Sequence, residues 1–305
     1  MRGAVSDAVP LPPLEKPEIE RLFHHARALV HRLRPAAVAR AGAARFERGI
    51  HPRRRAGPGD SFWQYRPFES GEPVQRIDWR RSARSDRLYV REREWETSRV
   101  LWLWVDRGPG MRFVSRSGLP TKEARALLLG FVAAWLAWEA GEVVGWAGRA
   151  GGGPFARATA RGLLTALAQG GDDGPLPPAA FAPGRMPARL LVIGDGLWPR
   201  AALEKATVHW RGARLEPMVV EILDPAEERF PYEGRLLLAA ASAAAPEPLM
   251  VEEGRAAAPE IERRLAAHRA ETEALLKAAG VAHLRLSTAI GGEAAAALLA
   301  GLLGC

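Results

Sequence analysis

The sequence contains almost no cysteine and very little lysine. Its one cysteine, Cys305, is the last residue, so the chain alone can form neither a disulfide framework nor a thiolate metal site. Only four of its 43 basic residues are lysine, and the formal net charge is +8. Arginine differs from lysine because its planar guanidinium can hold a carboxylate through two hydrogen bonds at once. The composition therefore favours surfaces built from arginine–carboxylate pairs.

Long apolar runs are also missing. The longest, residues 127–138, has 12 residues, whereas a membrane-spanning helix needs about 20. Residues 1–20 contain no apolar core of a secretion signal. We therefore expect a cytoplasmic protein without a membrane span.

The motifs of common enzyme classes are absent as well. No GxxxxGK[ST], GxSxG or HExxH motif occurs, and no GxGxxG opens a helix. The glycine-rich residues 147–154 follow a predicted strand, but no helix with Lys-Ser or Lys-Thr comes after them, so we predict a loop there. We expect no nucleotide site, no cofactor and no enzymatic activity.

Periodicity divides the rest of the chain into two parts. Residues 17–48 carry apolar side chains at helical spacing and predict a helix or a helix pair, with a break or restart at Pro35. From residue 99 onwards, strands and helices alternate. The predicted strands are 100–106, 142–148, 189–195, 217–224 and 282–288, and the predicted helices are 121–140, 157–170, 199–210, 257–279 and 293–303. This alternation predicts an α/β fold with a doubly wound, Rossmann-type, mostly parallel sheet.

Residues 57–98 form a charged, tryptophan-rich segment that leads directly into the first of these strands. Its ordered pattern consists of Gly59-Asp60, Tyr65, Arg66, Gly71, Arg76-Ile77-Asp78-Trp79, Ser82-Ala83-Arg84, Leu88, Val90, Glu94 and Val105-Asp106. This pattern resembles the DUF58 family of bacterial proteins. The likeness is strong over residues 49–112 and looser elsewhere, and the lack of a membrane helix is similar to the soluble branch of the family.

The resemblance implies a fold and a partner. It implies that the α/β part is a domain like von Willebrand factor A (vWA), and that the protein works with an AAA+ ATPase of the MoxR class. We therefore expect a tail and helical segment at 1–48, a signature segment at 49–98 and a vWA-like domain at 99–305. The expected role is that of a non-enzymatic adaptor between the ATPase and a client protein that the sequence does not name.

The signature segment supplies the candidate interaction residues. Tryptophan and arginine are the residue types that most often anchor interfaces. The candidates are Tyr65, Arg66, Arg76, Asp78, Trp79, Arg80 and Arg84. Asp78 and Trp79 can equally hold the segment to its own domain. Alternation in residues 86–96 predicts a salt-bridged β-hairpin with Leu88 and Val90 against an apolar surface.

Two aspartates at strand ends form a second candidate site. Asp106 and Asp195 each follow an apolar strand, and ligands of doubly wound sheets bind outside such ends. A vWA domain holds Mg²⁺ with Asp-x-Ser-x-Ser, but Gly108 and Gly110 replace both serines here, which makes the site degenerate. We expect Asp106 to pin the loop after it and to pair with an arginine. A Mg²⁺-dependent ligand-binding domain is the main alternative, although Arg107 and Arg112 would oppose a cation.

Nucleic-acid binding is a further alternative. Basic clusters occur at 51–57 and 80–84, and Trp63 and Tyr65 could stack on bases. However, residues 53–99 contain eight acidic residues among twelve arginines, and interspersed carboxylates interrupt a phosphate-binding stripe. This pattern favours protein over nucleic acid as the partner.

Overall fold

The computed structural model describes residues 11–48, 62–67, 79–83, 88–93, 99–148, 152–169, 174–179, 181, 183, 188–238 and 249–304. The elements are α1 (Lys16–Arg48), β1 (Phe62–Pro67), α2 (Trp79–Ser82), β2 (Tyr89–Arg93), β3 (Val100–Val105), η2 (Pro109–Arg112), α3 (Lys122–Glu139), β4 (Val143–Trp146), β5 (Gly152–Phe155), η3 (Arg157–Thr159), α4 (Ala160–Gln169), β6 (Ala188–Gly194), α5 (Arg200–Gly212), β7 (Leu215–Leu223), α6 (Pro225–Glu228), β8 (Leu236–Leu238), β9 (Leu249–Val251), α7 (Gly254–Ala278), β10 (Ala282–Ser287) and α8 (Gly292–Leu303). They belong to two compact units, Ala43–Ser98 and Met1–Gly42 with Arg99–Cys305.

The smaller unit contains an antiparallel pair of strands. β1 pairs with β2, with Tyr65 opposite Arg91. The short helix α2 is tied to β2 because the Tyr89 N–H donates to Ser82 Oγ at 2.9 Å. Leu88 was expected against an apolar surface, but it precedes β2 and its side chain is 43% exposed. The side chain of Val90 lies outside the described residues.

The larger unit is built on a six-stranded sheet with the order β10-β7-β6-β3-β4-β5. The first five strands are parallel, and only β5 is antiparallel to its neighbour β4. The α/β fold with a mostly parallel sheet is therefore confirmed. The loop expected over 147–154 is partly wrong, because β5 begins at Gly152. Two glycines and a proline, which are rare in strand interiors, kept this edge strand from being predicted.

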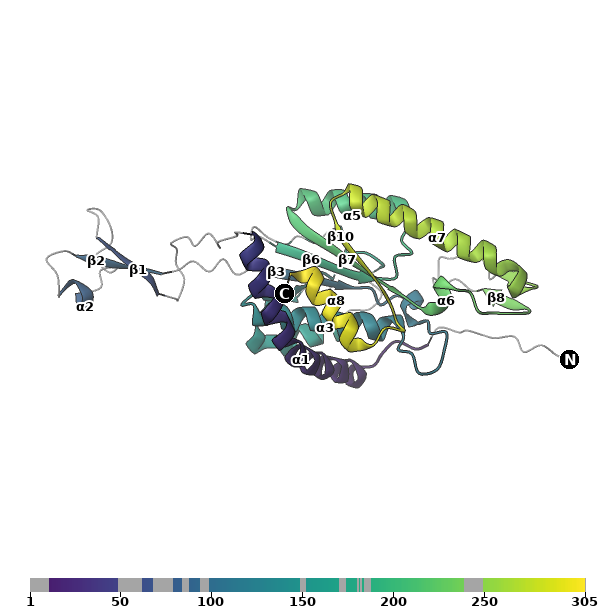
Figure 1. Cartoon of the computed structure of the whole chain (residues 1–305), viewed down its shortest axis with the longest axis horizontal. Coiled ribbons are helices and arrows are strands. Elements are labelled where there is room, and N and C mark those ends of the chain that lie inside the picture. Colours follow the sequence, from purple (N-terminus) through teal and green to yellow (C-terminus); the bar gives the residue numbers. More distant parts are fainter. Residues whose placement is uncertain are drawn as a thin grey trace. The chain divides into compact units, whose positions relative to one another are not determined.

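Helices cover both faces of this sheet (Figure 1). α3 and α8 lie on one face with the start of α1, whereas α5 and α7 lie on the other. All six residues of β3 are buried. Successive side chains of a strand point to opposite faces, so Val105 meets α3 at Gly130 while Trp102 meets the ring of Phe181 at a centroid distance of 5.0 Å. The core is thus continuous through the sheet.

Local signals fix the ends of α3. The Thr121 hydroxyl accepts the Ala124 N–H at 3.0 Å, and Gly141 follows the helix with a φ of 79°. Both boundaries agree with the sequence-based prediction, because a threonine cap satisfies a free N–H and glycine tolerates positive φ. The break predicted at Pro35 is wrong: α1 continues through it to Arg48. A proline removes one helical hydrogen bond and does not by itself end a helix.

No helix of the described ranges has both the length and the apolar character needed to cross a bilayer.

Candidate functional site at the carboxyl edge of the sheet

Four polar residues follow the ends of four parallel strands. Asp106 follows β3, Asp195 follows β6, Asp224 follows β7 and Thr288 follows β10. The chain runs from β3 to β4 in one direction and then returns to β6, β7 and β10 in the other. The order therefore reverses between β3 and β6, and ligands of doubly wound sheets bind at this position. The structure places Asp106 and Asp195 there, as expected, with the Asp106 N–H bonded to the Ile193 carbonyl at 2.8 Å.

A lysine supplies the positive charge at this switch point. Lys122, the first residue of α3, is only 1% exposed. Its Nζ donates to Glu227 Oε1 at 2.5 Å and to Asp195 Oδ2 at 3.4 Å. Burial alone would lower the pKa of Lys122, but the charges and hydrogen bonds of Asp195 and Glu227 outweigh it and raise that pKa. The ammonium is therefore charged at neutral pH.

The loop after Asp106 is held by the aspartate itself. The Gly108 N–H donates to Asp106 Oδ1 at 2.8 Å, and the Met111 N–H then donates to the Gly108 carbonyl at 2.9 Å. A Cβ at Gly108 would lie 3.1 Å from Asp106 Oδ1, so the close approach requires a small residue. This confirms that Asp106 pins the loop, and it explains glycine at the first degenerate position.

The neighbouring arginine has its own carboxylate. Arg107 Nε donates to Glu123 Oε1 at 2.8 Å, and both side chains are buried. Arg107 Nη1 donates to the Leu167 carbonyl at the end of α4. Arg112 Nη2 donates to the Arg107 carbonyl at 3.4 Å. Sequence reasoning expected these arginines to oppose a cation near Asp106, but the cation between the carboxylates is Lys122.

Glu227 was not a candidate in the sequence, although a local signal marks it. Asp224-Pro225-Ala226-Glu227 is a capping box, in which Asp224 Oδ1 accepts the Ala226 N–H and Glu227 Oε2 accepts the Asp224 N–H. The second oxygen of Asp224 accepts the Ser115 N–H at 3.0 Å. The capping box thus fixes the glutamate that binds Lys122.

The residues at the switch point do not fit a divalent metal. Mg²⁺ requires oxygen ligands, and here the ammonium of Lys122 binds an oxygen of both Asp195 and Glu227. Gly108 and Gly110 provide no hydroxyl oxygen. Within the described part of the chain, no group of three or more His, Cys, Asp or Glu side chains could hold an ion. Lys122 occupies the place between carboxylates where a cation would bind.

The candidate interaction residues are only partly described. Tyr65 and Arg66 belong to β1, and Arg80 belongs to α2, but their side chains lie outside the described residues. Arg76, Asp78 and Arg84 lie outside them altogether. Trp79 begins α2 and is 61% exposed. Their role in partner binding stays a prediction.

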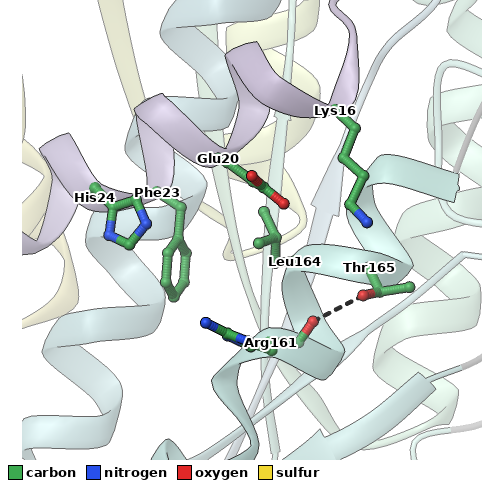
Figure 2. Close-up of a pocket in the computed structure, with 7 residues that line it drawn as sticks. All are labelled: Lys16, Glu20, Phe23, His24, Arg161, Leu164 and Thr165. Carbon is green, nitrogen blue, oxygen red and sulfur yellow. Dashed lines mark hydrogen bonds between the residues drawn. The ribbon is translucent and has the colours of Figure 1, made fainter.

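A separate cavity of about 240 Å³ lies between α1 and α4. Figure 2 shows that its walls come from both helices, with Glu20 and Lys16 of α1 above Leu164 and Thr165 of α4. The Thr165 hydroxyl donates to the Arg161 carbonyl at 3.0 Å. The cavity shares no residue with the switch point and contains no pair of carboxylates.

Comparison with protein families gives one match. Residues 64–169 match DUF58, described as a protein of unknown function. Over this segment the chain is similar to the DUF58 family. The DUF58 match covers about a third of the sequence, from β1 to α4, and so includes Trp79, Asp106 and Lys122 but not Asp195 or Glu227. No curated protein and no solved structure matches the chain.

Proposed function

We propose that this protein is a non-enzymatic adaptor that acts with a MoxR-type AAA+ ATPase in the cytoplasm. The partner follows from the family resemblance of the signature segment, and the doubly wound sheet is compatible with the vWA-like domain that the resemblance implies. In this proposal the ATPase supplies the nucleotide cycle, and the adaptor presents a client protein to it.

The exposure of Trp79 is the observation that supports an interaction role most strongly. Seven other tryptophans with described side chains are buried, at positions 102, 104, 135, 138, 146, 198 and 210. Trp79 is 61% exposed, and it is the only tryptophan of the smaller unit whose side chain is described. An exposed indole offers a large apolar area that a partner can bury. Trp79 is therefore the best candidate for an interface anchor.

The switch point supports a partner contact that does not depend on a metal ion bound to this chain. Lys122 neutralises Asp195 and Glu227 within the fold. A partner carboxylate could not complete the coordination of a bound ion there, which is how a metal-dependent domain would take its ligand. The proposed contact with the ATPase is accordingly independent of a metal in this chain.

A pull-down with the host's MoxR-type ATPase tests the proposal. Purified wild type should bind the ATPase and change its rate of ATP hydrolysis, whereas Trp79→Ala should bind at least tenfold more weakly, as for an interface anchor. Val208→Ala is the matched control, because Val208 is an exposed apolar residue of the larger unit, on α5. Circular dichroism should show that both variants are folded.

Three outcomes are distinguishable. Loss of binding in Trp79→Ala alone supports the adaptor role and locates its surface. Equal loss in Val208→Ala would contradict the assignment to Trp79. Absence of binding by wild type, with and without nucleotide, would overturn the proposed partner.

A further inference from the structure

Arg125 is a buried cation with no carboxylate partner among the described residues. It lies one turn after Lys122 on α3 and is only 5% exposed. One of its nitrogens, Nη2, donates to the Thr288 carbonyl at 3.1 Å. Within the described ranges, its Nε and Nη1 have no hydrogen-bond partner. Burial lowers the pKa of Arg125, which is the effect expected of a charge that lacks compensation.

The unpaired guanidinium lies beside the start of α8. A Cβ added at Gly292, the first residue of that helix, would lie 3.7 Å from Arg125 Nη1. The N-cap, Gly291, has no side chain to accept a hydrogen bond from the first turn. The first amides of a helix carry partial positive charge and have no helical acceptor. Two sources of positive charge thus meet at one place. α3 and α8 lie side by side in Figure 1.

The residue whose carbonyl accepts from Arg125 also carries a buried hydroxyl. Thr288 is 1% exposed, and among the described residues its Oγ1 has no hydrogen-bond partner. Its backbone is fully engaged, because its N–H donates to the Leu223 carbonyl at 2.8 Å and its carbonyl accepts from Arg125. A buried hydroxyl without a partner is costly, and such groups usually mark a missing ligand or water.

The nearby carboxylates do not fill the site. Both oxygens of Asp224, at the end of the neighbouring strand β7, accept backbone N–H groups. Glu293 is in the first turn of α8, but it is exposed and pairs with Arg32 at 3.8 Å. Gly291 is exposed and Gly292 is half-buried, so an ion from solvent can reach the first turn of the helix.

We propose that Arg125, Thr288 and the first amides of α8 form a binding site for a phosphate group. The guanidinium fork can bind two oxygens of a tetrahedral oxyanion, the Thr288 hydroxyl can donate to a third, and the helix start adds amide donors in the manner of other phosphate sites. Gly292 places no side chain between the start of α8 and Arg125 Nη1. The inference is independent of the proposed adaptor role.

Titration of the whole chain with inorganic phosphate tests the site. The protein is kept in a buffer without phosphate or sulfate, at constant ionic strength set by chloride, and binding is measured by calorimetry and by the shift in Tm. Wild type should bind saturably and its Tm should rise. A Tm that depends only on ionic strength would overturn the proposal. A small phosphate monoester in a parallel titration decides whether the group can be carried by a larger ligand, or only a free ion fits.

Variants assign the binding to the named donors. Thr288→Val should weaken phosphate binding roughly tenfold, the loss of one hydrogen bond to a charged group. Thr207→Val should leave it unchanged, because Thr207 is also buried but its hydroxyl donates to the Glu204 carbonyl in α5. Arg125→Met should abolish the phosphate-dependent shift in Tm.

Gly292→Ala is a second test variant that we expect to fold even if the Arg125 variant does not. Its added methyl would meet Leu128 at 3.5 Å and Arg125 at 3.7 Å, which are ordinary contacts in the protein alone. It should fold like wild type but bind phosphate more weakly, because the methyl takes space beside Nη1. Phosphate binding of wild-type strength in both Gly292→Ala and Thr288→Val would contradict the site.

Discussion

Lys122 and Arg125 lie three residues apart at the start of α3, and both cations are almost fully buried. Their surroundings are opposite. Lys122 lies between the carboxylates of Asp195 and Glu227, whereas the hydrogen-bond partner of Arg125 among the described residues is the Thr288 carbonyl. The pKa of the lysine is raised and that of the arginine is lowered. Both side chains are buried, so their different partners explain why the two pKa values shift in opposite directions.

The two sites differ in charge compensation. We call the switch point a closed site because its charges are compensated within the fold, and the start of α8 an open site because they are not. At the switch point the fold provides both the anions and the cation, so no external ion is needed. At the start of α8 the fold provides only donors. An uncompensated buried charge is strongly unfavourable, so the second place is where an anion would stabilise the folded chain. The variants below test whether the two cations differ as described.

Replacement of Lys122 should have the largest effect on stability. Lys122→Met leaves the buried Asp195 without its cation and leaves the half-buried Glu227 with only Arg269, whose Nη2 lies 4.0 Å from Glu227 Oε2. Breaking a buried pair costs about 3–5 kcal/mol. The free energy of unfolding, measured with urea, should fall by this amount. Lys205→Met on α5 is the control, because Lys205 is exposed and surface changes stay within about 0.5 kcal/mol. Similar losses in both variants would contradict the closed site.

Replacement of Glu227 should have a smaller effect. Glu227→Gln keeps the size of the side chain and a group that can accept the Asp224 N–H, and Lys122 retains Asp195 at 3.4 Å. The loss of one charge-assisted hydrogen bond costs about 1.5–3 kcal/mol. We expect a loss in that range in the same urea experiment. A loss as large as that of Lys122→Met would mean that Asp195 contributes little.

Alkaline pH should separate wild type from Lys122→Met. The pKa of Lys122 is raised above its ordinary value of 10.5 in the folded chain. Its contribution to stability is therefore fully present below 10.5 and is lost as pH rises through the higher folded value. The difference in unfolding free energy between the two proteins should shrink over that range.

Tyr232 also titrates there, since burial and Asp224 raise its pKa above 10.0, but it is present in both proteins. A difference that stays constant up to the alkaline unfolding of wild type would argue against the Lys122 pair.

Replacement of Arg125 should have the smallest effect on the free energy of unfolding, and the expected change is an increase where the other variants show a decrease. Arg125→Met removes one hydrogen bond to a carbonyl but also removes a buried charge without a carboxylate. In buffer without phosphate we expect an unfolding free energy between that of wild type and about 1 kcal/mol above it. Urea unfolding measures this directly. A loss near that of Lys122→Met would show that Arg125 is compensated in a way that the contacts do not reveal.

Local patterns in the sequence predict much of the fold. The apolar run of β3, the helical spacing and Thr121 cap of α3, and the aspartates after β3 and β6 all agree with the structure. These features depend on neighbours a few residues away, so a sequence pattern can report them. β5 was not predicted because glycine and proline are typical of loops. α1 continues through Pro35 because the loss of one helical hydrogen bond does not unfold the turns on either side.

By itself, the sequence determined the alternation of strands and helices, an aspartate at the end of each of two strands, and the resemblance of the signature segment to a family. Only the tertiary structure decided what those aspartates face. Lys122 is 73 residues from Asp195 and 105 from Glu227 along the chain, and Arg125 is 163 from Thr288. Such pairs form because parallel strands end at one edge of the sheet and α3 begins there. The charge balance of each site is therefore a property of the assembled sheet, which no local pattern contains.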